Sequence, residues 1–347
     1  MITKVYENPT IYKIDVPLPN NPLKNLNCYV VQDGDESLIL DTGFNRPECK
    51  DALLLGLQEL NVNWEKTNLF LTHLHSDHSG LAPALMHGKP GKIYMSKTDY
   101  DYLGWILNGN RWDTFDELYR KEGFTEEQIH WLMKENPARG FEADYYFDTV
   151  TVADGDLLSV GAYTFQCVSV PGHTPGQTCL YLPAEKLLFS GDHILFDITP
   201  NITSWVGVED SLGNYLDSLV KIRTFDMKTV LPSHRKNEMD VYVRIEEILH
   251  HHLLRLEETI DAIASFPDAH ATQIGSCLKW SMRGKAWEEF PLSQRWFAVG
   301  ETMAHLDYLI QRGFVRKTLG AFNGYTLTDT AEACKEKLNA LWAVYSI

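Results

Sequence analysis

The sequence has few cysteines, no long apolar run and no excess of basic residues. Six cysteines occur in 347 residues, none in a C-x-x-C pair, which is too sparse for a disulfide framework. We therefore expect reduced, structural thiols at all of them. They are Cys28, Cys49, Cys167, Cys179, Cys277 and Cys334. No apolar run approaches the roughly 18 residues that a membrane helix needs.

Charge and the first residues narrow the class of protein further. The formal net charge is −16, which argues against non-specific attraction to nucleic-acid phosphates. The opening stretch, Met1 to Glu7, has neither the basic start nor the apolar run of a secretory signal. We therefore expect a cytoplasmic protein with no membrane partner. A chain of 347 residues is long for one core, so two domains are expected.

The most specific stretch is T-H-L-H-S-D-H-S-G at residues 72–80, directly after an apolar run. In an extended segment, side chains two positions apart point the same way, so His73 and His75 can converge on one ion. Asp77 and His78 follow where the chain is expected to turn into a helix, beside the first pair. Two such pairs suit two metal ions. The alternative is a polar surface loop with exposed histidines.

Three further ligand candidates each follow an apolar, strand-like run. His173 lies in a P-G-H-T-P-G stretch, Asp192 follows Gly191, and His234 follows a Pro-Ser pair. Strand ends followed by Gly or Pro loops are where a sheet presents functional groups. Each of these signals is weak alone. They become informative together because each follows an apolar, strand-like run.

Together and in this order, these features resemble the metallo-β-lactamase superfamily. The resemblance is carried by the H-x-H-x-D-H run at 73–78, His173, the Gly191-Asp192 pair, His234, and the L-D-T-G stretch at 40–43. It covers roughly residues 27–234. The resemblance implies an α/β fold in which an αββα sandwich carries the site at one edge.

The resemblance also implies which residues hold metal. One ion would be held by His73, His75 and His173, the other by Asp77, His78 and His234, with Asp192 bridging them. Asp41 would not bind metal but would fix the orientation of a metal-binding histidine. Its alternative role is that of a turn-forming residue before Gly43.

Nitrogen and oxygen ligands without a cysteine favour two Zn²⁺ ions, and iron or manganese stay open. Two metals about 3.5–4 Å apart lower the pKa of bound water toward about 7 and polarise a carbonyl or phosphoryl oxygen. Asp77 would also orient the attacking water. We therefore expect hydrolysis of a small ester, thioester or lactone, as in glyoxalase II-like members of the superfamily.

Three alternatives stay open at this point. A phosphodiesterase or nuclease uses the same hydrolytic chemistry. A mononuclear iron persulfide dioxygenase uses part of the same ligand set and consumes oxygen. A non-enzymatic regulator would sense a ligand with the metal domain and bind DNA with the C-terminal part.

Residues 97–148 are predicted to be a helical insertion in the metal domain, 1–236. The insertion carries twelve aromatic residues, so it has enough apolar surface to cover the site. Trp105 and Trp112 would then line a substrate pocket, and Arg111 would suit an anionic substrate. A small core within the insertion, with Arg111 on the surface, is the alternative. Asp197 lies in a loop that could overhang the metals.

Residues 237–347 are predicted to form a smaller, mainly helical domain. The histidines of the tract at 250–252 would face different directions on a helix, so we expect them to be structural. A helix at 292–312 followed by a two-stranded turn resembles a winged helix. This region contains 11 Lys and Arg against 15 Asp and Glu, which disfavours nucleic acid. We therefore expect this domain to serve in packing or homodimerisation.

Overall fold

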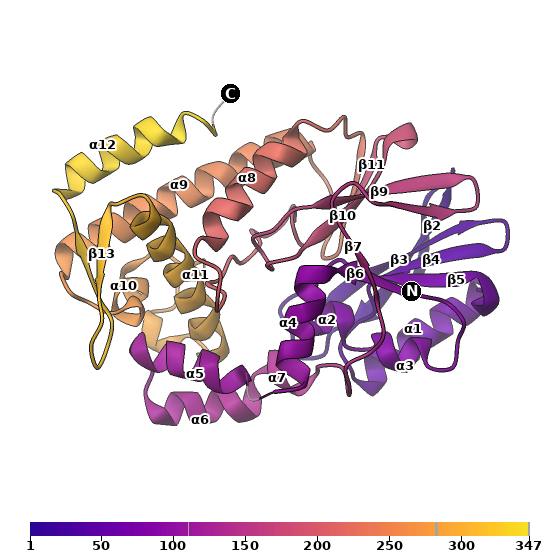
Figure 1. The fold of residues 1–347 in the computed structure, drawn as a ribbon, viewed down its shortest axis with the longest axis horizontal. Coiled ribbons are helices and arrows are strands. Elements are labelled where there is room, and N and C mark those ends of the chain that lie inside the picture. Colours follow the sequence, from indigo (N-terminus) through magenta and orange to yellow (C-terminus); the bar gives the residue numbers. More distant parts are fainter. Residues whose placement is uncertain (110, 282–283, 346–347) are drawn as a thin grey trace. The chain divides into compact units, whose positions relative to one another are not determined.

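The computed structural model describes residues 1–109, 111–281 and 284–345 (Figure 1). Contacts divide the chain into two compact units. Unit 1 comprises Met1–Gly109, Pro137–Pro200 and Thr224–Val241, and unit 2 comprises Asn110–Asn136, Asn201–Arg223 and Tyr242–Ile347. The last segment of unit 2 begins at Tyr242, near the predicted boundary at 237, but unit 2 also contains 110–136 and 201–223, which the sequence analysis places in the metal domain. The division into two domains at 237 stays a prediction.

Unit 1 contains two sheets, and the first has seven strands in sequence order. Its first three strand pairs are antiparallel and its last three are parallel. The strands are β1 (Ile2–Tyr6), β2 (Thr10–Pro17), β3 (Asn25–Asp33), β4 (Glu36–Leu40), β5 (Thr67–Phe70), β6 (Ile93–Ser96) and β7 (Val150–Val152). Strands β3 and β4 form a hairpin, in which Tyr29 pairs with Leu40.

The second sheet has five strands in the order β12-β11-β10-β9-β8, and its one parallel pair is β11 with β12. The strands are β8 (Leu157–Val160), β9 (Tyr163–Ser169), β10 (Thr178–Leu182), β11 (Leu187–Gly191) and β12 (Thr229–Pro232). Apolar side chains of the two sheets share one core, which includes Phe70 of the first sheet and the contacting rings of Phe165 and Phe189 of the second. Burying each such ring contributes roughly 1.5–3 kcal/mol.

The helices of unit 1 lie between strands of the first sheet, except η2, which lies between β10 and β11 of the second sheet. They are α1 (Pro47–Glu59), η1 (Trp64–Lys66), α2 (Ser76–Ser79), α3 (Ala82–Met86), α4 (Lys97–Leu107), α7 (Pro137–Gly140) and η2 (Pro183–Glu185). Helix α1 packs closely on β2, where a Cβ added to Gly56 would lie 2.8 Å from the Ile14 side chain. A glycine at this position lets helix and sheet approach each other.

Unit 2 is mainly helical, as predicted for the C-terminal region. Its helices are α5 (Arg111–Lys121), α6 (Glu126–Glu135), α8 (Ser211–Arg223), α9 (Val241–Ser265), α10 (Ala271–Cys277), η3 (Trp287–Glu289), α11 (Leu292–Gln311) and α12 (Ala331–Trp342). The expected two-stranded turn is the antiparallel pair β13 (Val315–Thr318) and β14 (Gly324–Leu327). Whether this arrangement acts as a winged helix stays a prediction.

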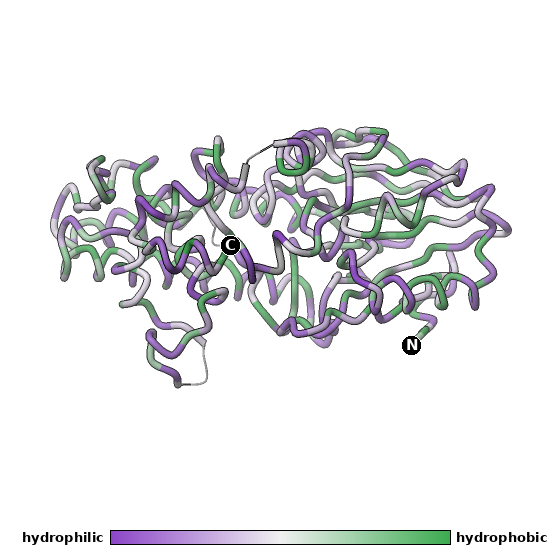
Figure 2. The backbone as a smooth tube through the Cα atoms, turned by 90° about the horizontal axis from the view of Figure 1, so that it is seen from below, coloured by the Kyte–Doolittle hydropathy of each residue, from purple (hydrophilic) through white to green (hydrophobic). Residues whose placement is uncertain are grey.

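Apolar and polar segments alternate along the backbone, as Figure 2 shows by colour. Among the described residues, no helix is both long enough and apolar enough to span a membrane.

Candidate metal centre

The candidate ligands follow the carboxyl ends of strands in both sheets of unit 1. The histidine-rich stretch 72–80 follows β5, Asp192 follows β11, and His234 follows β12. Because β11 and β12 are parallel, their carboxyl ends lie at the same edge of the sheet. The strand arrangement therefore brings together residues that are far apart in the sequence.

Local packing holds the stretch 72–80 in its turn. Helix α2 begins directly after His75, and Ser79 Oγ donates to the carbonyl oxygen of Leu74 at 2.8 Å. The backbone is packed tightly around Gly80. A Cβ added there would lie 2.5 Å from the Ser76 backbone oxygen and 2.7 Å from the Phe141 backbone oxygen. No larger residue fits at this position without a backbone shift.

All seven predicted ligand side chains lie together. They form three groups whose nitrogen and oxygen atoms lie within 4.8 Å of one another: His73, His75 and His173; His73, His78 and Asp192; and Asp77, His78 and His234. The first and third groups are the two ligand sets expected from the sequence.

Asp192 lies between the two sets. Its Oδ1 is 3.7 Å from His78 Nε2, whereas its Oδ2 is 3.7 Å from His173 Nε2 and 3.5 Å from His234 Nε2. Within the described residues, the buried Oδ1 has no hydrogen-bond partner. One carboxylate thus faces histidines of both sets, which is the position expected of a bridging group.

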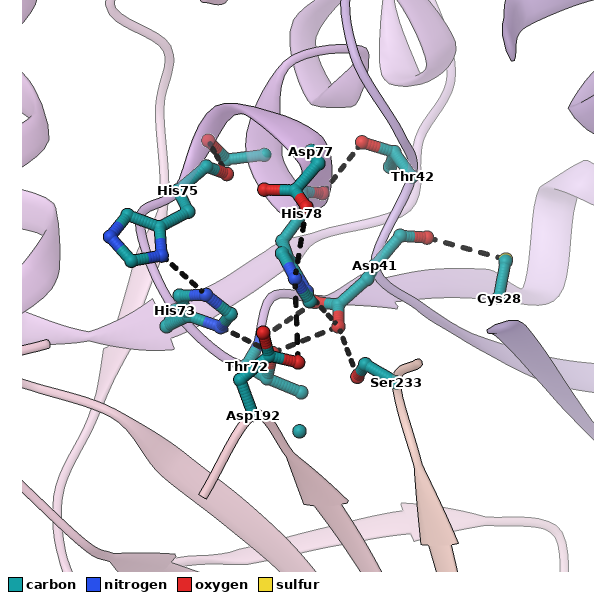
Figure 3. Close-up of polar contacts among 12 residues, drawn as sticks. Cys28, Asp41, Thr42, Thr72, His73, His75, Asp77, His78, Asp192 and Ser233 are labelled. Atoms are coloured by element: carbon teal, nitrogen blue, oxygen red, sulfur yellow. Dashed lines mark hydrogen bonds and ion pairs between the residues drawn. The ribbon is translucent and has the colours of Figure 1, made fainter. Parts of the chain in front are cut away.

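Neighbouring groups hold the Nδ1 atoms of His78 and His234, and Figure 3 shows Asp41 beside His78. Asp41 Oδ2 lies 2.8 Å from His78 Nδ1, and the carbonyl oxygen of Asn25 lies 3.0 Å from His234 Nδ1. Such contacts fix the tautomer and leave Nε2 free to bind metal. Consistently, the two Nε2 atoms of His78 and His234 are 3.3 Å apart.

Asp41 is buried, has a left-handed backbone conformation with φ of 61°, and accepts hydrogen bonds on both carboxylate oxygens. Its Oδ1 accepts a hydrogen bond from the Thr72 backbone N–H, and its Oδ2 accepts one from Thr72 Oγ1, both at 2.8 Å. Ser233 Oγ donates to Oδ2 at 3.3 Å. Asp41 therefore joins the segment before the histidine run to the segment before His234.

The protonation states of the cluster suit metal ligands. Burial and neighbouring imidazoles lower the pKa of His73, and burial lowers the pKa of His75 to about 4. Both rings are therefore neutral at pH 7, which is the form that binds metal. Burial opposes ionisation of Asp77, but His78 and His234 outweigh it and hold the pKa of this carboxyl below its usual range.

The centre attracts positive charge. Burial opposes protonation of His78, but three surrounding carboxylates more than offset it and raise the pKa of this imidazole to about 10. A divalent cation supplies the positive charge that these carboxylates favour. The neutral His73 and His75, the carboxylates around His78 and the Asp192 Oδ1 without a hydrogen-bond partner form a donor set that fits divalent metal ions, and a bound metal would take the place of the proton on His78.

The predicted pocket residues belong to different units. Trp105 lies on α4 in unit 1 with its ring against Tyr102, and the exposed Asp197 also belongs to unit 1. Trp112 lies on α5 in unit 2 with its ring against Phe115. The side chain of Arg111 lies outside the described part of the structure. The predicted insertion is therefore divided between the units, with 110–136 in unit 2.

Sequence reasoning missed Asp99, a fully buried carboxylate at the start of α4. The Ser96 side chain caps this helix by accepting from the Asp99 N–H, a pattern that predicts a helix start. That pattern gives no sign of burial. Burial raises the pKa of Asp99 to about 6, although hydrogen bonds from Thr174, Gly176 and Leu74 oppose the shift.

Comparison with known proteins connects this geometry to a family. Residues 22–234 match the family model described as the metallo-β-lactamase superfamily. The chain belongs to the metallo-β-lactamase superfamily. The fold class expected from the sequence is thereby confirmed, and the superfamily together with the His and Asp cluster implies divalent metal ions.

Curated relatives in this superfamily include thioesterases. The atrochrysone carboxyl ACP thioesterase of Emericella nidulans is 26% identical over 62% of this chain and 53% of its own length. The chain thus matches about half the length of that relative. The β-lactamase-like protein 2 homolog of Caenorhabditis elegans is 26% identical over 71% of this chain and 69% of its own length.

A solved structure resembles most of the chain. The metallo-β-lactamase family protein of Thermus thermophilus is 26% identical, with a TM-score of 0.78 over 91% of this chain and 98% of that one. Because this coverage exceeds residues 22–234, the likeness extends into the helices that follow the superfamily domain.

Proposed function

We propose that this protein is a binuclear metal-dependent hydrolase that acts on a thioester or a related small ester. The observation that carries the proposal is the position of Asp192 between two ligand sets of three residues each. A single carboxylate that faces both sets suits two ions that share one ligand. Two adjacent ions are the arrangement that hydrolytic metal sites use to activate water.

The two sets differ in charge. His73, His75 and His173 would hold one ion through nitrogen, while His78 and His234 would hold the other together with the carboxylate of Asp77. Nitrogen-rich sets with some oxygen ligands suit zinc best, and iron or manganese are the alternatives that metal loading must test. When bound, the ions would supply an activated water and polarise the carbonyl of the substrate.

Asp77 would act on the water as well as on metal. Its carboxylate is held ionised by His78 and His234, and its Oδ2 lies 3.4 Å from His234 Nε2. An ionised carboxylate at this place accepts a hydrogen bond from the attacking water and fixes the direction of attack. Asp41 would keep His78 in the tautomer that presents Nε2 to the centre.

Thioesters are the preferred substrate class because a curated relative at 26% identity is named as a thioesterase. Long nucleic acids are disfavoured because the chain carries a formal net charge of −16. On the same charge argument, we assign the C-terminal helices to packing or homodimerisation. Binding of small phosphodiesters does not require a positively charged protein surface, so these compounds remain the main competing substrates.

The test is a substrate panel run with zinc-, manganese- and iron-loaded protein. The panel contains small thioesters, a carrier-linked thioester, lactones, phosphodiesters and a persulfide, each assayed with and without oxygen. The proposal predicts that thioester hydrolysis is fastest and does not need oxygen. Turnover of phosphodiesters alone would contradict the proposal and favour a phosphodiesterase or nuclease. Oxygen consumption with a persulfide would contradict it and favour a persulfide dioxygenase. DNA binding at physiological salt without any turnover would favour a regulator.

A further inference from the structure

One buried carboxylate ties together the two backbone segments that carry the three-histidine set. Asp99 Oδ2 accepts a hydrogen bond from the backbone N–H of Leu74 at 3.0 Å and from Thr174 Oγ1 at 2.6 Å. Its Oδ1 accepts from the backbone N–H of Gly176 at 2.6 Å. Leu74 lies between two of the histidines, and Thr174 directly follows the third. Asp99 therefore contacts both segments without touching a candidate ligand.

The surroundings of Asp99 leave little room for another arrangement. The residue is 0% exposed and sits in the first turn of α4, where the Ser96 side chain fixes its backbone. A Cβ added to Gly176 would lie 2.3 Å from Ser96 Oγ and 2.9 Å from Asp99 Oδ1. The His173 segment is thus packed directly against this helix turn. Three converging donors require an acceptor with two oxygens, and a carboxylate provides that.

We propose that Asp99 is a positioning residue that holds the three-histidine set in metal-binding geometry. This inference rests on the proposed function, in which His73, His75 and His173 hold one ion. The two sets then have different supports, although Asp41 also reaches the three-histidine set through Thr72 Oγ1, which lies 3.0 Å from His73 Nδ1. Asp41 contacts a ring of the Asp-His-His set, whereas Asp99 holds the backbone on which the three-histidine set is mounted.

The proposal predicts selective damage to one of the two metal sites. Asp99→Asn keeps the size of the side chain but turns an N–H₂ group toward at least one N–H or O–H donor. The segments at Leu74 and Gly176 then lose their common acceptor. Affinity for the ion of the three-histidine set should fall roughly 10- to 100-fold, as for other groups that orient ligands. Affinity for the other ion should stay within about twofold of wild type.

The experiment titrates full-length metal-free protein with Co²⁺ and follows the visible absorption bands of each bound ion, with chelator competition for the affinities. Asp101→Asn is the matched control, because it removes the same charge from an exposed position on α4 that pairs with Lys97. Thr174→Val and Thr174→Ser form a second pair. Valine removes one donor to Asp99, whereas serine retains the hydroxyl and should restore binding.

The outcomes separate this inference from the proposed function. If wild-type protein binds fewer than two ions, the proposed function fails. If wild type binds two and Asp99→Asn binds both with unchanged affinity and spectrum, the positioning role fails while the function stands. Should Asp99→Asn not fold, Thr174→Val decides: a weakened site that serine restores supports the role, and an unchanged site overturns it.

Discussion

Asp41 Oδ2 lies 2.8 Å from His78 Nδ1, and this contact turns His78 Nε2 toward His234 Nε2 at 3.3 Å. The same carboxylate accepts hydrogen bonds from Thr72 and Ser233, so it joins two loops of the centre. Its position explains why an aspartate, and not simply a turn former, stands at residue 41. The contact also leads to the first prediction.

Asp41→Asn should leave both metals bound in loaded protein but lower metal affinity or activity about 10- to 100-fold. The amide N–H₂ group cannot accept from Thr72 and His78 as the carboxylate does, so the His78 ring loses its fixed orientation. Metal content and steady-state kinetics are measured together. Ser233→Ala removes a longer contact to the same oxygen and should have a smaller effect. Wild-type kinetics in Asp41→Asn would return Asp41 to a turn-forming role.

Asp192→Ala should do the most harm of any single ligand change. Its two oxygens face histidines of both sets, so its removal weakens both ions at once. We expect fewer than two metal equivalents after loading and loss of hydrolysis. Loss of one ion with hydrolysis intact would contradict the bridging role.

Trp105→Ala and Trp112→Ala should alter relative activity across the substrate panel while metal content stays at two. Both rings lie outside the ligand sets and contact other aromatic residues of 97–148, on α4 and α5 respectively. Trp131→Ala, at a position 40% exposed on α6, is the control. If both variants keep the wild-type profile or simply unfold, the aromatics serve as local core and the pocket must be sought in the loop 196–206.

Asp307 gives a stability prediction that is independent of the metals. Burial raises the pKa of Asp307 to about 6, although Ser204 donates a hydrogen bond to it. The unfolded chain has the ordinary value of about 3.9, so folding takes up a proton between about pH 4 and pH 6. The stability that depends on this proton is present below about pH 4 and is lost as pH rises through 6.

Asp307→Asn removes this loss while keeping an oxygen that accepts from Ser204. The variant should therefore gain stability over wild type at pH 7.5, by up to about 3 kcal/mol, and gain little at pH 4. Denaturant unfolding of both proteins at the two pH values measures the difference. A difference that does not change with pH would show that Asp307 is not the titrating group.

Much of unit 1 could be predicted because its signals are local. The apolar runs before His173, Asp192 and His234 are the strands β9, β11 and β12 with short connections, as expected. No comparable local signal marks β2, because prolines divide residues 5–26 into short apolar pieces. Proline removes a backbone donor but is tolerated at strand ends, and Pro17 ends β2 in this way.

Asp99 and the division of 97–148 could not be predicted, since both depend on contacts between distant segments. The donors to Asp99 come from residues 25 to 77 positions away. The aromatic content of 97–148 indicates that this segment buries apolar surface. It does not indicate in which unit's core the side chains lie. Tyr119, for example, stacks on Trp296 of unit 2. The histidines of the tract at 250–252 face different directions, as expected on a helix: His252 is buried against His305, and His250 is exposed.

The number of metal ions per chain tests the central claim most directly. Purified protein is stripped, loaded with zinc, manganese or iron in turn, desalted, and assayed by elemental analysis against protein concentration. Because seven donors form two sets that share Asp192, the account predicts two equivalents of the preferred metal. A plateau at one equivalent or less, with each metal, would contradict the binuclear centre.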